Sequence, residues 1–141
     1  MVYNITNIIN LDDMHNNNEE NVEIKLTSKR GRGVFAKKKF SKDDVIESCQ
    51  IIPFSSDDAD KIEKTILANY WFAWKTDNNP NEYGALCLGK GSLYNHSPSP
   101  NVLVIKDYDN NLIHFIASKE IPTGSEMTIK YGTIWFKEEN D

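Results

Sequence analysis

The sequence predicts one mainly β domain, of the β-rich α+β class, with a single main helix. The chain has 141 residues, which is the usual size of one domain and leaves no room for a second core. Many short apolar segments are separated by turns rich in Gly, Asn and Asp, as in strand-rich domains. Only one segment repeats its apolar residues at helical spacing.

Strand character begins after a polar N-terminal segment. Residues 1–21 are rich in Asn and acidic residues, so we expect a mobile tail. Residues 22–26 alternate apolar and charged side chains, as a half-buried strand does. Strand patterns resume at 34–36 and at 45–53, after the Gly31-Arg32-Gly33 interruption.

The one main helix is expected at residues 57–73. Ser56 or Asp57 can cap its N-terminus, where nearby carboxylates suit the helix dipole. The apolar residues at helical spacing are Ile62, Ile66, Leu67 and Tyr70.

Four more strands are predicted after the helix, at 85–88, 102–105, 113–117 and 127–129. Asp109-Asn110-Asn111 predicts a hairpin turn between the second and third of them. Residues 137–141 are expected to form a short acidic C-terminal tail.

Charge is unevenly distributed along the chain. The net charge of −5 argues against nucleic acid as the main partner. Residues 25–42 nevertheless carry eight Lys or Arg and no acid. We interpret this stretch as a solvated strand edge, with contact to RNA or a localisation signal as alternatives. Residues 43–63 carry seven acids against Lys61 alone.

Several broad classes of protein do not fit the sequence. No apolar run approaches the ~20 residues that cross a bilayer, and no signal peptide opens the chain. Cys49 and Cys87 are too few for a disulfide framework or a four-cysteine zinc site, and the histidines lack metal-ligand spacing, so no metal is expected. We therefore expect an intracellular protein, cytoplasmic or nuclear.

Four motifs follow one another in a specific order. The first is Ser28-Lys29-Arg30-Gly31-Arg32-Gly33-Val34-Phe35-Ala36. The second is Gly91-Ser92-Leu93-Tyr94-Asn95-His96-Ser97, followed by Pro98-Ser99-Pro100-Asn101. The third is Ile121-Pro122-Thr123-Gly124-Ser125-Glu126-Met127-Thr128-Ile129, and the fourth is Tyr131-Gly132, followed by Trp135-Phe136. The series resembles the SET-domain protein lysine methyltransferases over about residues 22–136, and is most similar to the minimal viral and bacterial members. This resemblance implies a SET-type fold of several small sheets with a C-terminal pseudoknot.

The resemblance also implies a function and a set of site residues. The expected reaction is methyl transfer from S-adenosylmethionine to a lysine side chain of a protein or peptide, such as a histone tail. Tyr131 would be catalytic and would line the lysine channel together with Tyr70. The residues implied to bind the cofactor are Gly31, Arg32, Gly33, Tyr94, Asn95, His96, Tyr131, Trp135 and Phe136.

Departures from the family pattern keep a second function open. The family often has a Glu-Tyr pair on the strand where this chain has Glu47-Ser48, and Lys130 stands where a smaller or acidic residue is usual. The alternative is a catalytically weak SET module that binds a peptide or partner. Each motif also has a purely structural interpretation: Gly31 and Gly33 as turn residues, Asn95 and His96 as a pair satisfying backbone groups.

Two further expectations concern partners. The aromatic residues Trp71, Phe72, Trp74, Trp135 and Phe136 are many for a small surface and predict at least partial homodimerisation. The acidic stretch 43–63 would flank a peptide groove and favour a basic substrate. In the alternative interpretation, Asp57, Asp58 and Asp60 only stabilise the start of the helix.

Overall fold

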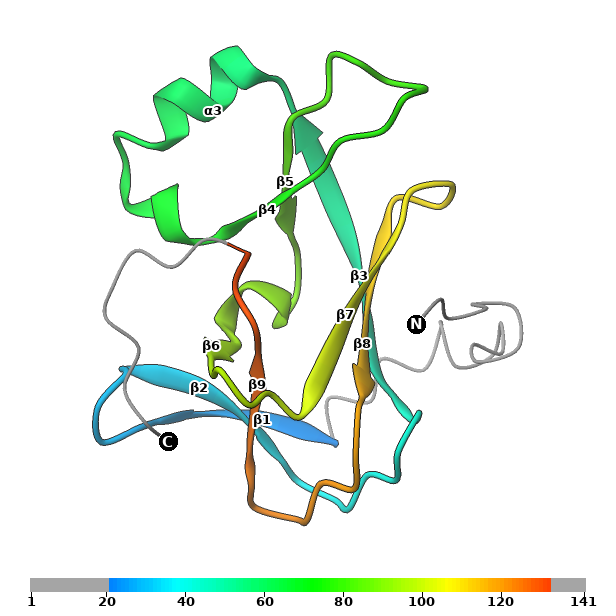
Figure 1. Cartoon of the computed structure of the whole chain (residues 1–141). Helices are drawn as coiled ribbons and strands as arrows, with labels where there is room; N and C mark the ends of the chain where they lie inside the picture. The colour runs from blue at the N-terminus through cyan, green and yellow to red at the C-terminus, as the bar shows by residue number, and fades with distance from the viewer. Residues whose placement is uncertain (1–20, 133–141) are drawn as a thin grey trace. The chain divides into compact units, whose positions relative to one another are not determined.

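The structure is a computed structural model and describes residues 21–132 (Figure 1). Its strands are β1 (Val22–Leu26), β2 (Arg32–Ala36), β3 (Val45–Phe54), β4 (Trp71–Ala73), β5 (Gly84–Cys87), β6 (Asn95–His96), β7 (Val102–Asp107), β8 (Leu112–Ala117) and β9 (Glu126–Ile129). Its helices are α3 (Ser56–Ile62) and the short 3-10 helices η1 (Ile66–Asn69) and η2 (Gly91–Leu93). Trp135, Phe136 and the acidic C-terminal tail lie outside the described residues, as does nearly all of the expected N-terminal tail.

The strands form two small sheets. One has the order β1-β2-β9-β6 and the other the order β4-β5-β3-β8-β7. The predicted fold class, strand-rich with little helix, is therefore confirmed. The chain also divides into two compact units. Within the described residues, unit 1 holds 21–48, 93–105 and 114–132, and unit 2 holds 49–92 and 106–113. The expected pseudoknot stays a prediction, because the chain beyond Gly132 is not described.

Strand β9 is the centre of the sheet in unit 1. It pairs antiparallel with β2, with Val34 opposite Met127, and parallel with β6, with Asn95 opposite Thr128 (Figure 1). On the outer side, β1 pairs antiparallel with β2. The third sequence motif therefore lies between the strands that carry the first and the second.

The core of unit 1 is built from the apolar residues of these strands and of the segments that join them. Its largest fully buried side chains are Phe40, Tyr94, Phe115, Ile116, Ile121 and Met127. Phe40 and Ile121 form a backbone bridge between two loops of this unit. Burial of so many large side chains supplies most of the stability of a small unit, at about 1.5–3 kcal/mol for each one.

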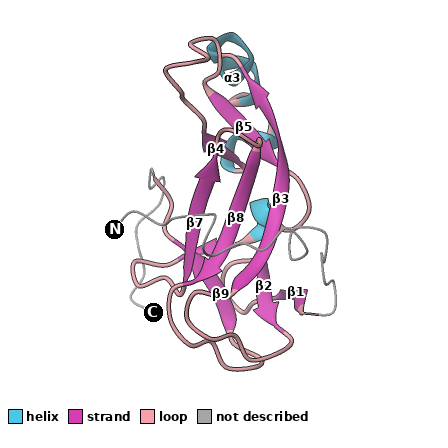
Figure 2. Ribbon diagram, turned by 90° about the vertical axis from the view of Figure 1, so that its right-hand side faces the viewer, coloured by secondary structure: helices cyan, strands magenta, loops and turns pink. Residues whose placement is uncertain are grey.

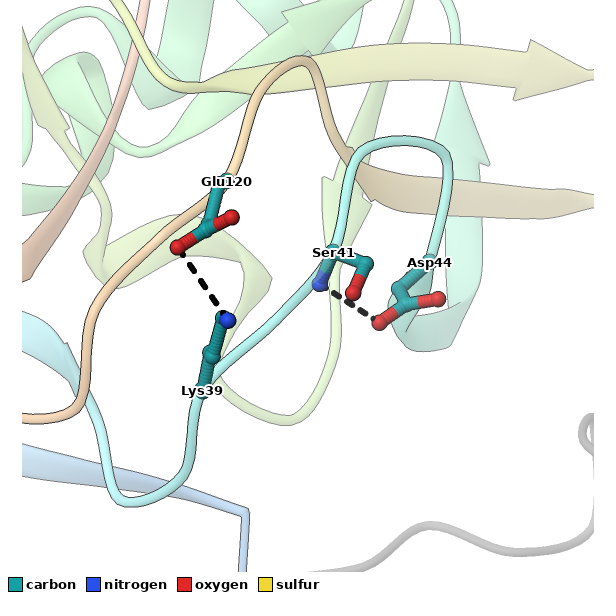
Figure 3. A network of polar contacts seen from close by, with 4 residues as sticks. All are labelled: Lys39, Ser41, Asp44 and Glu120. Carbon is teal, nitrogen blue, oxygen red and sulfur yellow. Dashed lines mark hydrogen bonds and ion pairs between the residues drawn. The ribbon is translucent and has the colours of Figure 1, made fainter.

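The first acidic residues of the stretch 43–63 serve a turn beside this bridge (Figure 3). The carboxylate of Asp44 accepts a hydrogen bond of 2.8 Å from the backbone N–H of Ser41, and Asp43 has a φ of 72°. Close by, Lys39 and Glu120 form an ion pair of 3.3 Å whose side chains are 62% and 64% exposed. Such exposed pairs contribute at most ~1 kcal/mol, so the hydrogen-bonded turn matters more here.

Unit 2 contains the end of β3 with β4, β5 and α3 (Figure 2). Strand β5 lies between β3 and β4, with Ile51 opposite Cys87 and Trp71 opposite Leu86. Both cysteines are buried, and they do not form a disulfide. Trp74 is fully buried and packs on Tyr108, with ring centroids 4.6 Å apart. Trp74 therefore cannot contribute to an exposed aromatic surface. Homodimerisation stays a prediction that depends on the other four aromatic residues named for it.

The predicted helix 57–73 is wrong in extent. Helix α3 ends at Ile62, a short 3-10 helix follows, and Trp71–Ala73 forms β4. Thr65 causes the break, because its extended backbone lets its hydroxyl donate to the Ile62 carbonyl and accept from the Leu67 N–H. The N-cap is Ser55, one residue before the predicted positions, and its side chain accepts from the Asp58 N–H.

The apolar spacing that suggested a long helix does not reflect a buried face. Ile66 is 84% exposed and Leu67 is 40% exposed. The aromatic residues after them pair with β5 instead, because aromatic side chains suit a pleated, half-buried strand. Pairing in a sheet has here overridden helix propensity.

We predict that Gly84→Ala destabilises unit 2. A Cβ at this position would lie 2.6 Å from Phe54 Cζ and 2.6 Å from Trp71 Cε3. Overpacking of this kind costs about 1–3 kcal/mol. Chemical denaturation should show the loss, and Gly132→Ala is the control, because no described residue beyond its chain neighbour lies within 4 Å of a Cβ there. Equal stability of the two variants would contradict the packing described for β3, β4 and β5.

Candidate active site

The two glycines of the first motif have different structural causes. Gly31 has a φ of +69°, and its carbonyl accepts hydrogen bonds from the N–H and hydroxyl of Thr27, which closes a turn. Gly33 is buried, and a Cβ there would lie 2.5 Å from Glu126 Oε2 and 2.9 Å from Asn95 Nδ2. The turn interpretation therefore holds for Gly31, whereas Gly33 is needed for close approach of the polar side chains.

Asn95 links the first motif to the third. Its Nδ2 donates to the backbone carbonyl of Arg32 at 3.0 Å and to Glu126 Oε2 at 2.8 Å. The side chain of Arg32 is exposed, so only its backbone takes part in this contact. Beside it, Asn101 holds β9 through bonds to the carbonyl of Glu126 and the N–H of Thr128.

Tyr131 is held at both ends by the residues that flank Asn95. Its hydroxyl donates to the backbone carbonyl of Tyr94 at 2.8 Å, and its backbone N–H donates to His96 Nδ1 at 3.0 Å. The rings of His96 and Tyr131 lie 5.3 Å apart. Because Nδ1 accepts a hydrogen bond, the neutral imidazole carries its proton on Nε2. The predicted catalytic tyrosine thus has a fixed backbone and a fixed hydroxyl.

Tyr94 belongs to the core rather than to an open surface. Its side chain is 1% exposed, its ring stacks on Phe115 at 4.5 Å, and its hydroxyl donates to Glu47 Oε1 at 2.7 Å. Because the side chain is buried, Tyr94 is expected to contact the cofactor only through its backbone. Glu47, counted among the acids that would flank a peptide groove, is engaged inside unit 1.

Two residues that the sequence left without a role lie in this cluster. Arg30 donates from Nη1 to the carbonyl of His96 at 2.7 Å, so the side chain before Gly31 ties the first motif to the second. Glu126 contacts Asn95 and limits the space at Gly33. The signal for Glu126 was present in the sequence, because it stands in the third motif with the spacing Gly-x-Glu-x-Thr.

Ser48 stands where the family often has tyrosine, and it has a buried partner. Its hydroxyl lies 2.8 Å from Nδ1 of His114, which is fully buried. The sequence predicts no role for His114, because the histidines lack metal-ligand spacing. The pair satisfies polar atoms inside unit 1, where an unmade bond would cost about 1–3 kcal/mol.

The other predicted site residues are not placed in this cluster. Tyr70 lies in unit 2 at the end of η1, half-buried, and its carbonyl accepts from the Ser92 hydroxyl. Its role in a lysine channel stays a prediction.

Within residues 21–132, no group of three or more His, Cys, Asp or Glu side chains could hold a metal ion. In the same part of the chain, no helix has the length and apolar character of a membrane span.

We predict that His96→Leu loosens the Tyr131 backbone. Removal of Nδ1 takes away the acceptor of its N–H, so amide hydrogen exchange at Tyr131 should accelerate by about tenfold, as for loss of ~1 kcal/mol or slightly more. His96→Asn is the matched control, because its amide oxygen can replace Nδ1. Unchanged exchange in the leucine variant would show that this hydrogen bond does not hold Tyr131.

Comparisons with known proteins identify the family of the chain. A SET-domain family model matches residues 31–132. A Schizosaccharomyces pombe relative, named "Histone-lysine N-methyltransferase, H3 lysine-37 specific", is 35% identical over 120 residues, which are 84% of this chain and 78% of the relative. The solved structure of a Plasmodium falciparum protein assigned to the histone methyltransferases has a TM-score of 0.59 and 29% identity, covering 84% of this chain and 99% of that one. The chain therefore belongs to the SET-domain family of protein lysine methyltransferases.

Proposed function

We propose that this SET-domain lysine methyltransferase takes its methyl group from S-adenosylmethionine and places it on a lysine in a basic peptide segment, such as a histone tail. One observation carries the proposal. Residues 94–96 hold Tyr131 from two sides, and the residue between those two contacts, Asn95, reaches Gly33 and Glu126 instead. One short segment thus joins the expected cofactor residues to the expected catalytic one.

The residues of the cluster fit the cofactor's amino-acid end. Gly33 has no Cβ, so the Glu126 and Asn95 side chains can lie directly against its backbone, where the ligand is proposed to bind. Both N–H groups of the Asn95 amide face protein acceptors, which leaves the carbonyl oxygen to accept from a ligand ammonium. When bound, S-adenosylmethionine would supply an electrophilic methyl group on a sulfonium. Gly31, Arg32, His96, Trp135 and Phe136 complete the proposed set.

A lysine substrate must lose a proton before its nitrogen can attack. Free lysine has a pKa of about 10.4, and desolvation favours the neutral amine. The same effect operates within this chain, where burial lowers the pKa of Lys106. A narrow, partly aromatic channel would act on the substrate in this way, with water accepting the proton.

Tyr131 is proposed to orient the amine. Its hydroxyl proton is donated to the Tyr94 carbonyl, and a phenol oxygen that donates can still accept. An amine whose N–H binds this oxygen would have its lone pair turned away from Tyr131 and free to attack the methyl group. Positioning of two reactants is the largest contribution expected here, since no strong general base is needed.

The substrate class is supported by charge and by the relative's name. The relative is a histone H3 enzyme by name, and histone tails are basic and extended. Of the acidic stretch, Asp44 and Glu47 have hydrogen-bond partners within unit 1. Asp57, Asp58 and Asp60 are exposed on α3. Steering of a basic peptide would therefore fall mainly to the acids of α3. A histone substrate also agrees with a nuclear location.

A catalytically weak module that binds a peptide remains the second candidate. The observation that favours it is Ser48, which pairs with His114 where the family often has an aromatic residue. A missing channel wall would slow the reaction more than it would weaken peptide binding. Measured turnover with a bound peptide separates the two functions.

We predict that Tyr131→Phe folds and binds S-adenosylmethionine but loses about 10²-fold in methyl transfer, because the ring remains and only the orienting hydroxyl is lost. Incubation with labelled cofactor and core histones, followed by mass spectrometry, measures the transfer. Tyr108→Phe is the control, since that tyrosine is 41% exposed and lies in unit 2. Wild-type turnover in Tyr131→Phe would remove the hydroxyl from the reaction.

We predict that Asp57→Asn combined with Asp60→Asn raises KM for a basic peptide severalfold and leaves cofactor affinity unchanged. Wild-type KM should also rise with salt, because exposed charges are screened over about 8 Å at physiological ionic strength. Asp44→Asn is the contrast, since its carboxylate holds a turn and should affect stability instead. A KM that responds to neither change would direct the search to neutral or acidic substrates.

A further inference from the structure

Glu126, the first residue of β9, has a fixed carboxylate beside the proposed cofactor residues. Its Oε2 accepts from Asn95 Nδ2 at 2.8 Å and would lie 2.5 Å from a Cβ at Gly33. Its backbone carbonyl accepts from Asn101 Nδ2 at 3.0 Å, and the residue pairs with Phe35 of β2. The pairing with Phe35, the bond from Asn101 and the side-chain bond to Asn95 therefore fix this carboxylate beside Gly33 and Asn95.

This carboxylate determines the orientation of the Asn95 amide, because it requires the nitrogen and not the oxygen of the amide to face Glu126. An amide group offers two N–H donors on nitrogen and only acceptor sites on oxygen. Asn95 meets two acceptors, the Arg32 carbonyl and Glu126 Oε2, and both are bonded to Nδ2. A rotation of 180° would direct the amide oxygen at a carboxylate and a carbonyl, which repels. The Asn95 oxygen is thereby kept on the opposite side.

We propose that Glu126 is a positioning residue, which orients the Asn95 amide so that its oxygen accepts from the α-ammonium group of S-adenosylmethionine. The inference rests on the proposed function, because that function supplies the ammonium ligand. Loss of the Glu126 carboxylate leaves the backbone carbonyl of Arg32, which is uncharged, as the single acceptor for the Asn95 amide. The amide is then less restrained, and both of its orientations become populated. Hydrogen bonds to charged acceptors are the stronger ones, so Glu126 supplies the larger part of the restraint.

Calorimetry with S-adenosylmethionine on the full chain tests the proposal. Glu126→Ala should weaken binding by about tenfold or more, the equivalent of ~1.4 kcal/mol, and Glu126→Gln by less, because its amide oxygen can still accept from Nδ2. The double variant with Asn95→Ala should lose little more than Asn95→Ala alone, because both residues act through one contact. Glu120→Ala is the matched control, a glutamate in unit 1 that is paired only on the surface.

A second measurement reports on the amide itself without any cofactor. In the ¹H–¹⁵N spectrum of the free protein, the side-chain NH₂ signals of Asn95 should shift in Glu126→Gln and stay unchanged in Glu120→Ala. Glu126→Gln keeps the size of the side chain, so it provides the test even if Glu126→Ala does not fold.

The outcomes separate this proposal from the proposed function. Suppose that the wild type binds S-adenosylmethionine and that Glu126→Gln and Glu126→Ala bind it as tightly as the wild type, or that the losses of affinity from the Glu126 and Asn95 substitutions simply add. The positioning role of Glu126 is then wrong, and the proposed function stands. If the wild type does not bind S-adenosylmethionine at all, the proposed function fails and this inference fails with it.

Discussion

The pairing of β9 with two different strands is the constraint on which the candidate active site depends. Its antiparallel contact with β2 brings Gly33 and Arg32 to one edge, and its parallel contact with β6 brings Asn95 and His96 to the other. A parallel pair needs a long connection, and residues 97–125 provide the one between β6 and β9. The motif residues come together only in this sheet, because the motifs are separated along the chain. The chemistry proposed for them therefore depends on the sheet.

Within that sheet, alternation along residues 94–96 divides two tasks between neighbouring residues. The Tyr94 carbonyl and the His96 imidazole hold Tyr131, while the Asn95 side chain reaches Arg32 and Glu126. Because the three residues are consecutive, a shift of one contact moves the others. Packing of the buried Tyr94 ring against Phe115 stabilises residues 94–96. The proposed positioning of the reactants would thus depend on the packed core.

The sequence predicted the strands of unit 1 because their apolar residues recur and their turns carry Asn, Asp or Gly, but it did not predict the two-residue strand β6, which has no apolar side chain. It predicted the motif residues through resemblance, and Gly33, Asn95, His96 and Tyr131 do lie in one unit. The helix was predicted too long, since a threonine hydroxyl that ends one helix and starts another leaves no periodic signal. The partners of Glu47, Ser48 and Glu126 depend on tertiary contacts between residues 31 to 66 positions apart, which no local pattern reveals.

The central claim is that residues 94–96 join the cofactor to the catalytic tyrosine. A crystal structure of the full chain with S-adenosylhomocysteine, the demethylated product, tests it most directly. The account predicts the product's amino group within hydrogen-bond distance of Asn95 Oδ1 and the Tyr131 hydroxyl still bonded to the Tyr94 carbonyl. A product bound away from Gly33 and Asn95, or a Tyr131 hydroxyl rotated off that carbonyl, would contradict it.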